Sequence, residues 1–173
     1  MTTSRASRPR PASAAARPAT WLVALPPTPA SLDAFVRDAR PTPQAFAAAV
    51  EALLASPHFG ERWGRHWLDV ARFAESSGGG RTLLFKDAWR YRDYVIEAFN
   101  ADLPFDRFIR EQLAGDLLPA ATPEEKRRQI TATAFLALGP TNYEEQNKDA
   151  LRMDVVDEQL DTLGKAFLGM TVG

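Results

Sequence analysis

Hydrophobic residues recur along most of the chain at the three- and four-residue spacing of amphipathic α-helices. The clearest such stretches are residues 46–54, 59–74, 91–98, 105–113 and 156–170. No stretch shows sustained alternation of apolar and polar residues, the period of two that is typical of a half-buried strand. The pattern therefore predicts an all-α fold: a single domain of about seven helices with no substantial sheet.

Helix starts are marked by a hydroxyl residue followed by proline, which suit the N-cap and the first helical position. Four such pairs precede apolar stretches: Thr28-Pro29, Thr42-Pro43, Ser56-Pro57 and Thr122-Pro123. Glu125 extends the last pair into a capping box, because its carboxylate is predicted to reach back to the amide of Thr122. Gly139-Pro140 then supplies a C-terminal helix signal.

The N-terminal segment differs from the rest in composition. Residues 1–24 are rich in Arg, Ala and Pro, with too few large apolar side chains to order themselves. They are predicted to form a disordered tail before a helical domain at 25–173. The apolar run at 21–25 is much shorter than the ~20 residues of a membrane span and shorter than the core of a secretory signal. Neither element is predicted.

Composition and charge exclude several chemistries. The chain has no cysteine, which excludes disulfides, thiol catalysis, Cys-ligated zinc and covalent haem attachment within it. The formal net charge is −1, although residues 1–20 hold four Arg and no acidic residue; the remainder is therefore acidic. Nucleic acid, which needs a basic face, is not an expected partner. No metal site is predicted, because no His-x-x-x-His or Glu-x-x-His spacing occurs.

One predicted helix holds most of the chemistry-bearing side chains. Arg62, His66 and Asp69 fall on one of its faces, and Arg65 and Arg72 flank Asp69 at helical spacing. One interpretation makes His66 a proton carrier or metal ligand oriented by Asp69. The favoured interpretation is structural, with Asp69 holding an ion-pair network with Arg65 and Arg72. Arg62, Arg65, His66 and Asp69 are the first candidate binding residues.

Trp89, Arg90 and Arg92 form a second candidate binding group. Arg and aromatic residues alternate here, and rings beside Arg can stack on bases or sugars. The same pattern more often forms a core edge covered by Arg stems.

Two further groups are assigned to the fold rather than to a site. Trp63 and Trp67 lie four residues apart on an apolar stripe and are predicted to be core residues. Four acidic residues near the C-terminus are interpreted as a solvated helix face rather than a cation site: Asp154, Asp157, Glu158 and Asp161.

Several long segments together resemble a known family. They are SPHFGERWGRHWLDVARFA at 56–74, AWRYRDYVI at 88–96, PFDRFIREQLAGD at 104–116 and GKAFLGMTVG at 164–173. LPPTP at 25–29 matches the start of the same domain. The chain resembles the domain-of-unknown-function 1549 family, the planctomycete-type cytochrome c associated domain, over about residues 25–173.

The resemblance implies a place in a larger exported protein. In the family, the segment matching 171–173 leads into a Cys-x-x-Cys-His motif that attaches haem c; the chain is therefore expected to be a fragment that itself holds no cofactor. The expected function is a non-catalytic helical module that positions a c-type haem of the parent for electron transfer, with the parent's other domains as partners and a periplasmic or exported location. The alternative is an exported enzyme or binding module for acidic polysaccharides. No catalytic residue is carried over from the family.

Overall fold

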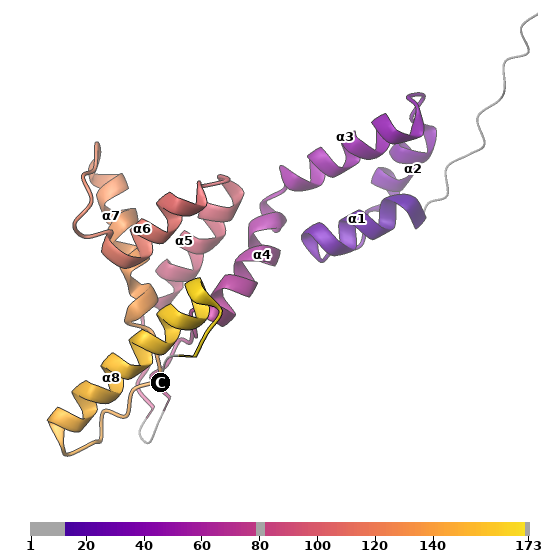
Figure 1. Ribbon diagram of the computed structural model, residues 1–173. Coiled ribbons are helices and arrows are strands. Elements are labelled where there is room, and N and C mark those ends of the chain that lie inside the picture. The colour runs from indigo at the N-terminus through magenta and orange to yellow at the C-terminus, as the bar shows by residue number, and fades with distance from the viewer. Residues whose placement is uncertain (1–12, 79–81, 172–173) are drawn as a thin grey trace, which may run out of the picture. The chain divides into compact units, whose positions relative to one another are not determined.

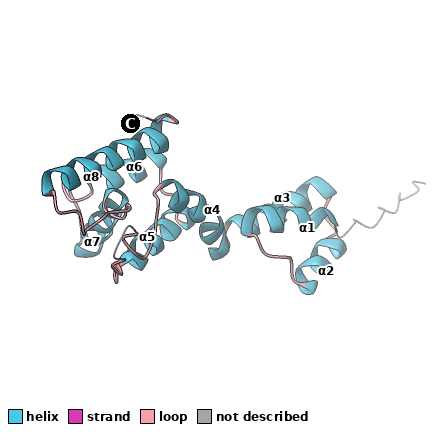
Figure 2. Ribbon diagram, turned by 90° about the horizontal axis from the view of Figure 1, so that it is seen from below, coloured by secondary structure: helices cyan, strands magenta, loops and turns pink. Residues whose placement is uncertain are grey.

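The computed structural model describes residues 13–78 and 82–171, and side chains from residue 16 onward. Within this part the chain forms eight α-helices, two short helical turns and no strand, apart from an isolated bridge between Ser76 and Leu84. Figures 1 and 2 show the helical ribbons. The predicted all-α class is confirmed. The helices divide into two compact units, Met1–Arg62 and Trp63–Gly173, where the sequence analysis expected one domain.

The N-terminal unit is built on three helices: α1 (Ser13–Val23), α2 (Pro29–Arg37) and α3 (Thr42–Leu54). Each of the three contacts the other two, and their shared interior holds Ala19, Phe35 and Ala45. A cavity of about 290 Å³ remains among them, lined largely by alanines. The unit therefore packs mostly small side chains.

Helix α1 lies inside the range 1–24, where the sequence analysis predicted a disordered tail. The prediction is wrong for this stretch, because Ala19 and Val23 are buried and give α1 an inner face. Trp21, by contrast, is 71% exposed. α1 also brings the number of helices to eight rather than about seven, whereas residues 1–12 of the predicted tail lie outside the described residues.

Local sequence signals set most helix starts. Thr28 accepts a hydrogen bond from Ser31 N, Ser56 from His58 N, and Thr122 from Glu125 N. The fourth pair behaves differently, because α3 includes Thr42 and follows Pro41. In the predicted capping box, the carboxylate of Glu125 accepts from the amide of Ala121 rather than that of Thr122.

The C-terminal unit contains the later turns of α4 (Pro57–Val70) and every helix after it. These are α5 (Ala88–Asn100), α6 (Phe105–Ala114), α7 (Pro123–Ala132), the 3₁₀ turn η1 (Thr133–Leu136), α8 (Lys148–Leu163) and the π-helical turn η2 (Gly164–Leu168). Helices α5 and α6 both pack against α7 and η1. The side chains that these helices bury against one another form the core of the unit.

Aromatic rings dominate this core. Trp67 stacks on Phe135 with ring centroids 5.6 Å apart and meets Phe108 edge-on at 4.8 Å. Tyr94 also stacks on Phe108, with ring centroids 6.0 Å apart. Trp67 is buried, as predicted, but Trp63 is 36% exposed; the prediction that it is a core residue is wrong. One helical turn separates the two, and only Trp67 enters the aromatic cluster.

The end of α6 approaches α7 closely at Gly115. A Cβ atom added there would lie 1.9 Å from the carbonyl oxygen of Gln129 and 2.6 Å from that of Glu111. Only glycine fits such a distance, because both neighbours are backbone atoms. This approach brings α6 and α7 together where the buried polar side chains described below meet.

Candidate functional site

The candidate residues on α4 do not form one cluster. Arg62 is half-buried and its Nε lacks a hydrogen-bond partner within the described residues. Arg65 and His66 are exposed. The imidazole of His66 lies against the ring of Trp63, with centroids 5.5 Å apart. This arrangement supplies neither an oriented base nor a ligand set.

The ion-pair network predicted around Asp69 is wrong. Asp69 is exposed and makes no ion pair within the part of the chain that the structure describes. Arg72 instead pairs with Glu158 of α8. The reason is that α4 ends at Val70 and Arg72 takes a left-handed backbone conformation, with φ of 55°. The helical spacing that placed Arg72 beside Asp69 therefore stops before it reaches Arg72.

The candidate residues on α5 are partly engaged with one another. The guanidinium of Arg90 lies 5.1 Å from the centroid of the Trp89 ring and pairs with Asp87. Arg92 pairs with Asp93 and Glu75. A cavity of about 700 Å³ adjoins this helix, and its lining includes Arg90 but neither Trp89 nor Arg92. The three residues therefore do not line a common cleft.

The acidic residues of α8 are likewise distributed. Glu158 pairs with Arg72 and Asp161 with Lys165, whereas Asp154 and Asp157 are exposed. No group of three or more potential metal-ligating residues occurs within residues 13–78 and 82–171.

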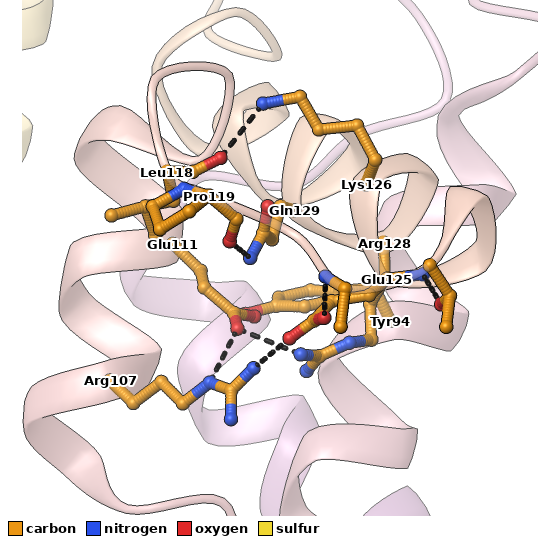
Figure 3. A network of polar contacts seen from close by, with 11 residues as sticks. Tyr94, Arg107, Glu111, Leu118, Pro119, Glu125, Lys126, Arg128 and Gln129 are labelled. Carbon is orange, nitrogen blue, oxygen red and sulfur yellow. Dashed lines mark hydrogen bonds and ion pairs between the residues drawn. The ribbon is translucent and has the colours of Figure 1, made fainter.

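A buried carboxylate that the sequence analysis missed organises α5, α6 and α7 (Figure 3). Glu111 is fully buried, and its Oε1 accepts hydrogen bonds from Arg107 at 3.0 Å and from Arg128 at 2.8 Å. Its Oε2 accepts from the hydroxyl of Tyr94 at 3.0 Å. Arg107 also contacts Glu125 at the start of α7. Two cations and a hydroxyl thus compensate the buried charge, as such a charge requires.

A second polar chain runs beside the first. The indole N–H of Trp67 donates to the hydroxyl of Tyr91, which donates to Oε1 of buried Gln112. Burial raises the pKa of Tyr91 and of Tyr94 above the usual tyrosine range, and nearby Glu111 raises that of Tyr94 further. Both hydroxyls therefore stay protonated at neutral pH and act as fixed donors.

One family model matches nearly the whole sequence. Residues 4–173 match the model of a family described as a protein of unknown function, DUF1549. The chain belongs to the DUF1549 family. No curated protein and no solved structure matched the chain.

The buried face of this DUF1549 chain explains why Glu111 and Gln112 escaped the sequence analysis. On α6 the predicted apolar stripe included Phe105 and Leu113, but both are exposed. The buried side chains at Phe108, Glu111 and Gln112 share a face at helical spacing. Because two of these three buried residues are polar, the spacing of hydrophobic residues does not predict which face of α6 is buried.

No helix in the described part of this DUF1549 chain has both the length and the hydropathy needed to cross a membrane.

Proposed function

We propose that this DUF1549 chain is a non-catalytic helical module of a larger exported, cytochrome c-like protein, in which it positions a neighbouring c-type haem domain for electron transfer. The observation that carries the proposal is an unpaired apolar stripe on α8. The finer identity of the neighbour rests on the family resemblance. The buried polar groups support a structural role, because Glu111 is held by three donors and is closed to a substrate.

The stripe consists of Met153, Val156 and Leu160, which are exposed at helical spacing on α8. Leu168 and Met170 add exposed apolar surface after the helix. The sequence spacing also placed Leu163 and Phe167 on this stripe, but both pack against the core. Contiguous apolar surface of this kind commonly marks a site of contact with another protein or domain.

This chain cannot itself hold haem c. Covalent attachment needs two thiols beside an axial histidine, whereas the sequence has no cysteine and only two histidines. His58 is paired with Glu61 and His66 lies on Trp63. The proposal therefore assigns haem binding to the neighbouring domain and gives this chain the part of a support.

The test is made on a longer protein that continues past Gly173 into the proposed haem domain. Leu160→Asp removes part of the stripe, and Leu117→Asp, at an exposed loop position, is the matched control. We expect Leu160→Asp to increase hydrogen exchange along α8 and to slow haem reduction by an external donor severalfold, while the control changes neither. A colourless longer protein, or equal effects of the two substitutions, contradicts the proposal. The 173-residue chain alone is expected to show no Soret absorbance.

A further inference from the structure

A cavity of about 540 Å³ lies between α8 and the segment that follows η1. Leu136, Pro140, Leu151 and Val155 supply its apolar wall. This wall faces away from the exposed stripe, because Leu151 and Val155 are on a different side of α8 from Met153, Val156 and Leu160. The cavity is therefore separate from the surface on which the proposed function depends.

Arg72 lines this cavity and is largely buried. Its side chain is 19% exposed, and the guanidinium lies flat against Gly139, where an added Cβ atom would be 2.9 Å from both terminal nitrogens. Burial lowers the pKa of Arg72 below the usual arginine value, while Asp161 opposes that shift. A left-handed conformation at a non-glycine residue, φ of 55° here, costs about 1 kcal/mol or more. The fold thus holds a partly desolvated cation in a strained position.

The charges around the cavity are unbalanced. Glu158 neutralises Arg72, but Lys148 and Arg152 also line the cavity, without a second acid. Arg152 is exposed and makes no ion pair within residues 13–78 and 82–171. Residues 141–173 contain only three basic residues against seven acidic ones. Two of those three cations are therefore gathered at this one cavity, in an otherwise acidic part of the chain.

We propose that this cavity binds a small organic anion in which a carboxylate adjoins an apolar face. The carboxylate would meet Arg152 and Lys148 at the rim, with Arg72 behind them, and the apolar face would lie against Leu151 and Val155. Charge-assisted hydrogen bonds to guanidinium are among the strongest polar contacts in proteins, and an apolar wall with a few polar groups is the usual form of a small-molecule site. The proposal is independent of any haem domain.

Two sources supply this chemistry: a free aryl or alkyl carboxylate, and the uronic acid of a sugar chain. The binding experiment therefore titrates the whole chain with 4-phenylbutyrate and, separately, with digalacturonate, using calorimetry or ligand-observed NMR. The neutral 4-phenylbutyramide is the chemical control. We expect at least one carboxylate to bind, with phenylbutyrate about tenfold tighter than its amide if it is that one, which corresponds to about 1.4 kcal/mol. Failure of both carboxylates to bind, or equal binding of phenylbutyrate and its amide, overturns the proposal.

Variants locate the site. Arg152→Gln should weaken binding about five- to tenfold, because it removes an unpaired cation at the rim. Arg127→Gln, exposed on α7 and outside the cavity, is the matched control and should change binding less than twofold. Val155→Phe should narrow the cavity at its apolar wall and weaken binding while circular dichroism stays helical. Equal weakening by Arg127→Gln and Arg152→Gln, or full binding by Val155→Phe, would show that the anion binds elsewhere and would overturn the proposal.

Discussion

The two units bury different kinds of side chain. In the N-terminal unit the buried residues are mainly small, Ala19 and Ala45 among them, and Phe35 is the one large ring buried within its described part. In the C-terminal unit Trp67, Tyr91 and Phe135 are buried together. Because hydrophobic stabilisation scales with the apolar area removed from water, the C-terminal unit gains more from each buried residue. The C-terminal unit also buries the charged carboxylate of Glu111, because hydrogen-bond donors surround that carboxylate.

The aromatic core should respond most strongly to truncation. Trp67→Ala removes a ring that contacts Phe108 and Phe135 and should cost about 3–5 kcal/mol of unfolding free energy, measured by urea unfolding with circular dichroism. Trp89→Ala, at a tryptophan that is 45% exposed, is the control and should cost about 1 kcal/mol or less. Similar losses for the two variants would mean that the ring cluster does not dominate the stability of this unit.

The buried carboxylate should come next. Glu111→Gln keeps the shape but removes the carboxylate that pairs with Arg128 and leaves Arg107 with Glu125 alone; the expected cost is about 2–3 kcal/mol. Glu124→Gln changes an exposed pair with Arg127 and should cost about 0.5 kcal/mol or less. Both values come from the same urea titration. If the two substitutions had equal effects, Glu111 would not organise the three helices around it.

The N-terminal unit should instead respond to added volume. Ala49 lines its cavity of about 290 Å³, so Ala49→Leu should stabilise the unit by about 0.5–1 kcal/mol. Hydrogen exchange at the amides of α1 and α3 reports this unit directly, and exchange there should slow. Ala47→Leu, at an exposed position outside the cavity lining, should leave the rates unchanged. Faster exchange in Ala49→Leu would mean that the interior is already tightly packed.

The smallest expected effect is a pH dependence at the start of α7. The amide of Ala121 and the guanidinium of Arg107 hold the pKa of Glu125 below its ordinary value of 4.5. The folded state therefore gains stability above that ordinary value and loses it as the pH falls through the lowered pKa. Glu125→Gln should flatten the acid limb of unfolding free energy against pH. An unchanged acid limb, or an ordinary pKa for Glu125 by NMR titration, would contradict this prediction.

The sequence predicted those features that depend on residues close together along the chain. The caps at Thr28, Ser56 and Thr122 could be found because each bond joins residues two or three positions apart. Arg72 and Glu158 could not be paired in this way, since they are far apart in sequence and Arg72 lies beyond the end of its helix.

Hydrophobic periodicity also fails where a helix buries charge. Glu111 resembles a solvated residue until Arg107, Arg128 and Tyr94 are seen around it, and Arg128 comes from another helix. The candidate binding sites could not be predicted for the same reason, because they depend on contacts between segments that are distant in sequence. Arg90 lies over the ring of its neighbour Trp89, but whether such residues line a cleft depends on segments distant in the chain.

The close approach at Gly115 has a genetic consequence. Every single-nucleotide missense change of a glycine codon introduces a residue that carries a Cβ atom, and at this position that atom would lie 1.9 Å from a backbone oxygen. Neither neighbour is a flexible side chain that could turn aside, so α6 and α7 would have to separate, and Arg128 of α7 would move away from Glu111 of α6. No single missense mutation at this codon is therefore compatible with the helix packing. Among sequences that keep this packing, Gly115 should accept no amino-acid replacement, while exposed Leu117, two positions later, should vary freely.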